Sequence, residues 1–185
     1  TVLVTGAFGN LGQMVLKALK QHGYRVLAMD LDNPRNRKLA NSSHDYDDII
    51  WGDLRNTDFK PLVQNCIAVI HLAAVLPPVT ETAAELAWDI NVNATLRLID
   101  AIEASTNKPL LVYPSSVTLF GCPEPAHTLM RSDDDVSASD NYTRHKLAVE
   151  ERLANSQIPW SVLRVGVSVD SRTLGADLSM MRKLF

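Results

Sequence analysis

Short apolar runs alternate along the chain with longer stretches of helical periodicity. The apolar runs are rich in β-branched residues and predict strands at 1–5, 25–29, 48–51, 67–71, 110–113 and 158–165. The spacing of apolar residues elsewhere predicts helices at 11–19, 80–104, 142–155 and 174–185. Because strands and helices alternate, the pattern predicts an α/β fold, a doubly wound (Rossmann) parallel sheet with helices on both faces.

A glycine-rich turn joins the first predicted strand to the first predicted helix. It has the spacing Gly-x-x-Gly-x-x-Gly, with glycines at 6, 9 and 12. In such a turn the first glycine permits a sharp bend, the second lets a pyrophosphate approach the backbone, and the third lets the helix pack closely on the strand. The N-terminus of the helix also attracts phosphate. The residues predicted to contact a cofactor here are Gly6, Phe8, Gly9, Asn10, Leu11 and Gly12.

The end of the second strand favours a dinucleotide site over an ordinary strand–loop–helix turn. Asp30 stands there, about twenty residues past the glycines, where an acid hydrogen-bonds the ribose hydroxyls. Its charge repels a 2′-phosphate, so the sequence predicts NAD rather than NADP. Arg35, Arg37 and Lys38 follow and could meet such a phosphate, but a solvated basic loop after Pro34 is the simpler prediction.

The third and fourth strands end in residues that could line the same site. The carboxyl ends of parallel strands meet at one edge of the sheet, where ligands bind in open α/β folds. Asp53 and Leu54 follow the third strand and are predicted to border the adenine. Leu72, Ala73 and Ala74 follow the fourth, where small residues let a cofactor lie against the backbone. Each of these residues, taken singly, is equally compatible with a plain loop.

Two asparagines interrupt the predicted helix at 80–104. An asparagine inside a helix is unfavourable unless its side chain has a partner. We therefore expect Asn91 to hydrogen-bond across to the neighbouring strand or to the catalytic region, and Asn93 to lie at the surface.

A phenol and an ammonium group share one face of the predicted helix at 142–155. Tyr142 and Lys146 are four residues apart, which is about one helical turn. A nearby ammonium stabilises phenolate and lowers the pKa of the phenol, so Tyr142 is predicted to act as a general acid or base. The fifth strand leads into Ser115 and Ser116, and a serine hydroxyl there can hold a substrate oxygen. Tyr-x-x-x-Lys is common by itself; its occurrence with the glycine turn and Asp30 predicts an enzyme.

These motifs together resemble an extended short-chain dehydrogenase/reductase of the NAD-dependent epimerase/dehydratase group. The resemblance runs over residues 1–167. It implies that Tyr142 is the catalytic acid/base and that Lys146 binds the nicotinamide ribose and tunes Tyr142. It implies that Ser116, which precedes Gly121 by the family spacing, hydrogen-bonds the reacting oxygen. It also implies that Asn91 contacts the cofactor, and that hydride passes between a substrate carbon and nicotinamide C4.

The resemblance leaves more than one activity open. Sugar-nucleotide dehydratases carry Thr-Asp-Glu where this chain has Ser-Val-Thr at 116–118, so dehydration is disfavoured. The run Asn-Val-Asn-x-Thr-Leu-Arg-Leu-Ile at 91–99 is similar to UDP-hexose 4-epimerases. The apolar loop at 75–78 and the absence of the family's Asn-bearing turn at 165–168 instead favour a less polar hydroxy-ketone. An NAD-dependent epimerase, a dehydrogenase or reductase, and a non-catalytic dinucleotide sensor all stay open.

The length bears on the domain organisation. Extended family members run well beyond 185 residues and place a smaller substrate-binding domain after the sixth strand. We interpret residues 1–167 as the NAD-binding domain, which includes the catalytic serine, tyrosine and lysine. Residues 168–185 are interpreted as the start of a substrate-binding region that is truncated.

Composition narrows the classes of partner. The formal net charge of −3 offers no basic field for nucleic acid, and no apolar run is long enough to span a bilayer. The two cysteines lack a paired spacing, which favours a reducing compartment and a cytoplasmic protein. The five histidines are scattered, so no metal site is expected. A small-molecule substrate is therefore the expected partner, and the family resemblance adds a homodimer.

Overall fold

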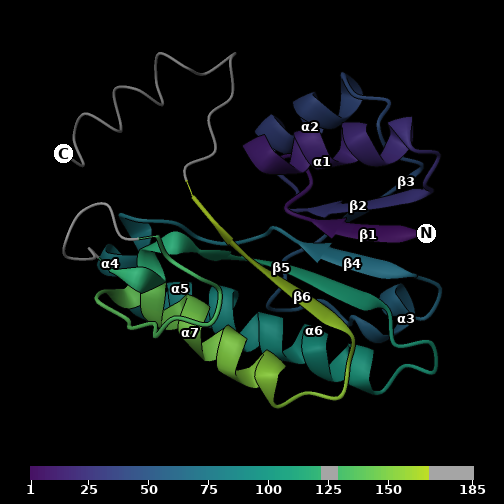
Figure 1. Cartoon of the computed structure of the whole chain (residues 1–185). Helices are drawn as coiled ribbons and strands as arrows, with labels where there is room; N and C mark the ends of the chain where they lie inside the picture. Colours follow the sequence, from purple (N-terminus) through teal and green to yellow (C-terminus); the bar gives the residue numbers. More distant parts are fainter. Residues whose placement is uncertain (122–128, 167–185) are drawn as a thin grey trace.

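Six parallel strands form one sheet in the order β3-β2-β1-β4-β5-β6 (Figure 1). The computed structural model describes residues 1–121 and 129–166. Every neighbouring pair of strands is parallel. The strands are β1 (Val2–Thr5), β2 (Val26–Asp30), β3 (Asp48–Trp51), β4 (Ala68–His71), β5 (Leu110–Ser116) and β6 (Trp160–Val165). The strand order reverses between β1 and β4, which opens a crevice at the carboxyl edge of the sheet.

Helices lie on both faces of the sheet. Figure 1 shows α1 and α2 over one face and α3, α6 and α7 over the other. The helical elements are α1 (Asn10–Gln21), α2 (Pro34–Asn41), α3 (Lys60–Val63), α4 (Val79–Thr82), α5 (Ala84–Trp88), the π-helical turn η1 (Asp89–Asn93), α6 (Ala94–Glu103), the 3-10 turn η2 (Val117–Phe120) and α7 (Asn141–Ala154). This arrangement confirms the predicted doubly wound α/β fold.

The core consists of one apolar layer on each side of the sheet. Side chains alternate between the two faces of a strand, so Val2 and Val4 pack under α1 while Leu3 packs toward α6 and α7. All three are fully or almost fully buried. A central parallel strand is buried on both faces, which explains why β1 reads as a continuous apolar run. Four buried polar strand residues lie at the carboxyl ends of their strands, where the crevice opens: Thr5, His71, Ser115 and Ser116.

The basic stretch after Pro34 was wrongly predicted to be a loop. It forms helix α2, in which Asn33 is the N-cap and its side chain accepts a hydrogen bond from the backbone N–H of Asn36 at 2.9 Å. Proline in the first helical turn needs no N–H donor there and has a helical φ already. The Asn-Pro pair was therefore the sequence signal for a helix start, although the apolar periodicity is weak.

The predicted helix at 80–104 is divided into α4, α5, η1 and α6. The division between α4 and α5 falls at Ala83, whose φ of −135° and ψ of 57° are not helical. The π-helical turn η1 contains both asparagines, and Asn91 lies in it with its side chain turned to other elements. The predicted helix at 174–185 and the region 168–185 lie outside the described residues.

Within the ranges 1–121 and 129–166, no helix has the length and apolar character needed to cross a membrane.

Candidate active site

A cavity of about 400 Å³ opens at the carboxyl ends of β1 to β4. Many of the residues predicted to bind a cofactor line it, namely Gly6, Gly9, Asp30, Asp53, Leu54, Leu72, Ala73 and Ala74. The strand order reverses at this point, so the cavity occupies the position where doubly wound sheets bind ligands. The sheet topology thus brings together residues from four separate turns.

The glycine turn is shaped by a close approach between two loops. Gly6 has a φ of +65°, and a Cβ there would lie 2.7 Å from the backbone nitrogen of Ala73. A Cβ on Gly12 would lie 2.2 Å from the carbonyl oxygen of Gly6. Neither position therefore tolerates a side chain. Gly9 is the N-cap of α1 and provides no side-chain cap, so the first-turn N–H groups, including those of Asn10 and Leu11, suit an anionic group.

Asp30 is held in place by three nitrogen donors. Its Oδ2 accepts from the backbone N–H of Phe8 at 2.8 Å. Its Oδ1 accepts from the backbone N–H of Leu31 at 2.8 Å and from Nδ2 of Asn36 at 3.0 Å. Phe8 therefore contributes its backbone to Asp30, while its buried ring stacks on Trp51 rather than lining the cavity. The sequence did not single out Asn36, because the helix that positions it was predicted to be a loop.

The basic residues near Asp30 differ in their availability. Arg37 donates to Asp32 at 2.7 Å and lies over the ring of Trp51. Arg35 lines the cavity. The ion pair with Asp32 therefore occupies the guanidinium of Arg37, which is not among the residues that line the cavity.

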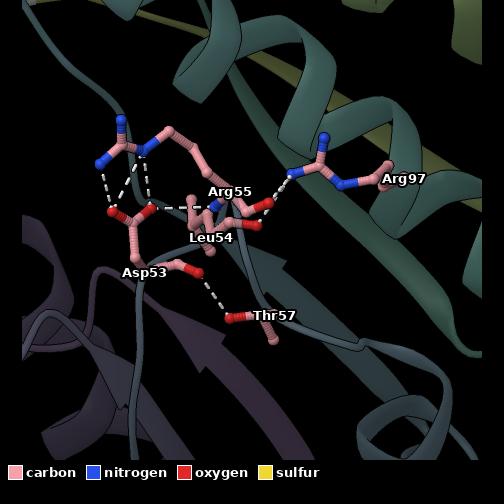
Figure 2. Close-up of polar contacts among 5 residues, drawn as sticks. All are labelled: Asp53, Leu54, Arg55, Thr57 and Arg97. Carbon is pink, nitrogen blue, oxygen red and sulfur yellow. Dashed lines mark hydrogen bonds and ion pairs between the residues drawn. The ribbon is translucent and has the colours of Figure 1, made fainter.

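The loop after β3 is fixed by an arginine on α6 that the sequence analysis did not single out (Figure 2). Arg97 on α6 donates to the carbonyl oxygens of Leu54 at 3.1 Å and Arg55 at 2.7 Å. Thr57 Oγ1 donates to the carbonyl of Asp53 at 2.7 Å. The guanidinium of Arg55 pairs with Asp53 at 2.6 Å and lowers the pKa of that carboxyl. These contacts hold Leu54 against the cavity.

Lys146 and Tyr142 lie together where α7 passes the end of β5. The ammonium of Lys146 is buried, donates to the carbonyl of Pro114 at 2.7 Å and lies 5.6 Å from the centre of the Tyr142 ring. Burial lowers the pKa of Lys146 to about 8. Ser116 ends β5, and its hydroxyl is hydrogen-bonded to Oγ1 of Thr118 at 2.7 Å. The structure thus brings the three predicted catalytic residues to one place.

The pKa of Tyr142 differs from the expectation. Burial raises the pKa of the phenol, and the side chain of Ser116 only partly opposes that effect. Lys146 does not lower this pKa here, and its ammonium donates to the carbonyl of Pro114. Desolvation therefore outweighs charge, and the phenol keeps its proton at neutral pH.

The start of α7 is fixed by a reciprocal cap. Oδ1 of Asp140 accepts from the backbone N–H of Thr143 at 2.7 Å, and Oγ1 of Thr143 accepts from the backbone N–H of Asp140 at 3.0 Å. This capping box satisfies two free donors of the first turn. Tyr142 lies between the two capping residues, so its backbone position is set by them.

Asn91 bonds to other elements, as its sequence context predicts. Its side chain hydrogen-bonds both backbone groups of Val75 and the imidazole of His145. Asn93 is exposed and donates to Asp89 at 3.1 Å, which confirms its surface position. Asn91 is not among the residues that line the cavity; it contacts the loop that does.

A buried histidine connects strands β1 and β4 to helix α6. His71, at the end of β4, is hydrogen-bonded through Nδ1 to Thr5 at 2.7 Å and through Nε2 to Thr95 at 2.9 Å. Thr95 donates to the carbonyl of Asn91, so it accepts from His71, and Thr5 donates to Nδ1. The imidazole is therefore neutral, and burial lowers its pKa to about 3. A histidine ending an apolar strand was the only sequence signal of this arrangement.

The strand order and the glycine turn between β1 and α1 define a dinucleotide-binding (Rossmann) fold. A family model described as the NAD dependent epimerase/dehydratase family matches residues 2–164. The chain therefore belongs to the NAD-dependent epimerase/dehydratase family.

Curated relatives are similar over most of the chain. It is 32% identical over 163 residues to UDP-glucose 4-epimerase 1 of Oryza sativa subsp. japonica, which covers 82% of this chain and 45% of that protein. It is 30% identical over 173 residues to methionine adenosyltransferase 2 subunit beta of Bos taurus, covering 90% of this chain and 46% of that protein. The chain thus spans about half the length of these relatives.

Solved structures show the same fold with bound ligands. A UDP-glucose-4-epimerase from Stenotrophomonas maltophila, with bound NAD and formylated UDP-arabinopyranose, is 25% identical with a TM-score of 0.75 over 89% of this chain and 52% of that chain. MoeE5 in complex with UDP-glucose and NAD is 29% identical with a TM-score of 0.69 over 87% of this chain and 52% of that chain.

Proposed function

We propose that this chain forms the cofactor-binding and catalytic part of an NAD-dependent epimerase or dehydrogenase. The reaction is reversible hydride transfer at a secondary alcohol or ketone of a sugar nucleotide or a similar substrate. The observation that carries the proposal is the buried ammonium of Lys146 beside Tyr142, at the same sheet edge as the cavity that contains Asp30. Residues 1–167 form the NAD-binding domain in this proposal, and the rest of the full-length protein supplies most of the substrate pocket.

The chemistry of the cavity fits NAD. The oriented carboxylate of Asp30 suits two ribose hydroxyls and repels a 2′-phosphate. The turn at Gly6 and Gly9 and the N-terminus of α1 suit a pyrophosphate. Leu54 and Ala73 offer apolar and small surfaces to the rings. When bound, NAD supplies the site that accepts and returns hydride.

The chain's own residues supply the proton and hold the reacting oxygen. Because burial raises its pKa, Tyr142 holds a proton at neutral pH, which suits the acid that protonates a ketone oxygen as it is reduced. In the reverse direction the same phenol oxygen takes the proton back. The hydroxyl of Ser116 hydrogen-bonds the reacting oxygen, and the ammonium of Lys146 would hold the nicotinamide ribose of bound NAD.

The named relatives support a sugar nucleotide as the substrate. Several of them are UDP-sugar epimerases or have UDP-sugars bound. The decisive experiment incubates the full-length protein and NAD with UDP-, GDP- and dTDP-sugars, uronic acids and hydroxy-ketones. A new isomer of unchanged mass without net NADH identifies an epimerase, and net NADH with an oxidised product identifies a dehydrogenase. Conversion only of hydroxy-ketones would assign the less polar alternative.

A second candidate is a dinucleotide-binding subunit without turnover. One relative is named as the beta subunit of methionine adenosyltransferase 2, which is a subunit and not an epimerase by name. Tight NAD binding with no conversion of any substrate in the panel would favour this role.

A cytoplasmic homodimer completes the proposal. The free, buried thiol of Cys66 suits a reducing compartment. Leu86 and Trp88 on α5 are exposed apolar side chains beside the site, which supports a contact between two copies there. Light scattering of the full-length protein tests the dimer, since the mass should halve when Trp88 is replaced by Glu.

A further inference from the structure

Asn91 connects two segments that are far from it in the sequence. Its Oδ1 accepts from the backbone N–H of Val75 at 2.7 Å, and its Nδ2 donates to the carbonyl of Val75 at 2.8 Å. The same Nδ2 faces Nδ1 of His145 at 3.1 Å. The side chain therefore bridges the loop after β4 and helix α7.

These contacts fix the protonation of His145. The backbone of Val75 presents one donor and one acceptor, so it sets which end of the Asn91 amide is nitrogen. An amide nitrogen only donates, and Nδ1 of His145 must therefore accept. The imidazole in this arrangement is neutral and carries its proton on Nε2.

The bridge is closed off from water. His145 is 2% exposed and Asn91 is 5% exposed. The ring of Trp88 packs edge-on against the imidazole, with ring centres 5.3 Å apart. A buried donor that loses its acceptor has no water to replace it. Breaking the hydrogen bond between Asn91 and His145 therefore has a high free-energy cost.

The bridge ends at the wall of the candidate cofactor cavity. Val75 lines that cavity, directly after Ala73 and Ala74. Both backbone groups of Val75 are held by Asn91, so the position of this wall depends on how firmly the asparagine is held. His145 precedes Lys146 on α7 and supplies the contact on the other side.

We propose that His145 is a positioning residue that holds Asn91, and through it the cavity wall at Val75, in the arrangement that binds NAD. The inference rests on the proposed function, because NAD binding is one of its two readouts. Protonation turns Nδ1 into a donor that faces another donor. The bridge is therefore present while His145 is neutral and is lost when His145 is protonated.

The surroundings of His145 keep it neutral at neutral pH. The groups that face it come from every packed element: Glu81 of α4, Trp88 of α5, Asn91 of η1, and Asp140, Arg144 and Lys146 at or in α7. Burial is the largest effect and lowers the pKa; the two acids raise it and the two cations lower it. The net direction is a lowered pKa, so the bridge is complete at pH 7 and opens as the pH falls through the acidic range.

Nuclear magnetic resonance of the isotope-labelled, full-length protein without NAD tests the bridge directly. As the pH is lowered from 8 through the titration of the His145 imidazole, the backbone amide signal of Val75 should shift together with that titration. In His145→Gln, an amide oxygen can still accept from Asn91 but does not titrate, so the shift of Val75 should disappear. The control His44→Gln, at an exposed histidine, should leave it unchanged. A Val75 signal that ignores the titration of His145 overturns the inference.

Calorimetry with NAD tests the functional consequence. Losing one buried hydrogen bond should weaken NAD binding by about threefold to tenfold in the unmodified protein between pH 8 and a pH below the titration of His145. His145→Gln should show much less of this change, and His145→Phe should bind weakly at both pH values. The same pH dependence in the unmodified protein and in His145→Gln overturns the inference. If NAD does not bind at either pH, the proposed function fails, and the signal of Val75 decides the inference by itself.

Discussion

At the scale of single residues, the site depends on a glycine at a position where a side chain would not fit. Gly6 and Ala73 approach so closely that one added carbon atom would overlap the neighbouring backbone. Asp30 shows the complementary case, in which three donors from separate positions fix one carboxylate. In both arrangements the proposed binding of NAD depends on one particular residue, so each can be tested by one substitution.

Gly6→Ala should abolish measurable NAD binding. The substitution puts a Cβ 2.7 Å from the backbone of Ala73 and also strains a φ of +65°. Gly23→Ala is the matched control, because Gly23 has a φ of +77° but nothing within 4 Å of a Cβ. It should lose about 1 kcal/mol of stability from backbone strain and bind NAD normally. Calorimetry and denaturant unfolding of both variants measure this, and equal NAD affinities would contradict the steric account.

Tyr142→Phe should lower turnover by about 10²- to 10⁴-fold while NAD binding is retained. The phenol ring packs as before, and only the hydroxyl that moves the proton is lost. Turnover is measured on the substrate that the panel identifies, and NAD affinity by calorimetry. Full activity of this variant would exclude Tyr142 as the acid/base.

At the scale of elements, the site is held by contacts between segments that are distant in sequence. The carbonyls of the loop after β3 are held from α6 (Figure 2), and the loop after β4 is held from η1. In each case a side chain on a helix fixes the backbone of a loop. The helices that pack on the sheet therefore do more than cover its faces, since their side chains determine where the cavity walls lie.

Arg97→Gln should weaken NAD binding several-fold, by roughly the value of one or two hydrogen bonds. The guanidinium holds two backbone carbonyls of the loop that carries Leu54. The adenine half of NAD faces that loop in the proposed binding mode, so AMP should lose affinity as NAD does. The matched control is Arg25→Gln, which breaks an exposed ion pair with Asp48 and should change neither affinity. Unchanged AMP binding in Arg97→Gln would contradict this role.

At the scale of the whole molecule, the buried histidine at the centre of the sheet makes the free energy of unfolding depend on pH. His71 connects β4 to Thr5 of β1 and to Thr95 of α6. Its pKa of about 3 lies far below the ordinary value of about 6.5. The unfolded chain therefore binds a proton as the pH falls below the ordinary value, while the folded chain does not until about pH 3.

The free energy of unfolding should consequently fall by about 2 kcal/mol between pH 7 and pH 5 through His71, since each pKa unit is worth about 1.4 kcal/mol. This stability is fully present above the ordinary pKa and is lost progressively as the pH falls toward 3. Denaturant unfolding at a series of pH values measures it, and a resonance titration of His71 in the folded state provides the control. A folded-state pKa near the ordinary value would contradict the prediction.

Much of this protein can be predicted from its sequence. The apolar runs of β1 and β4 and the helical periodicity of α1 and α7 are local patterns, and local sterics and burial convert them into strands and helices without further information. The glycine spacing, Asp30 and the Tyr-x-x-x-Lys pair are recognisable for the same reason, because each requirement is met within a few residues of chain. The sequence thereby determines the fold class and the candidate site residues.

Only the tertiary structure decides how these residues are held. Asn36, Arg97 and His145 have no local signal, because their partners lie on other elements and the chain must fold before they meet. The pKa of Tyr142 was also predicted wrongly from spacing, since one helical turn brings Lys146 near but cannot reveal that Pro114 takes up its ammonium. Burial and the choice of hydrogen-bond partner are properties of the packed molecule. They determine the protonation state of ionisable side chains that the sequence can identify but whose surroundings it does not reveal.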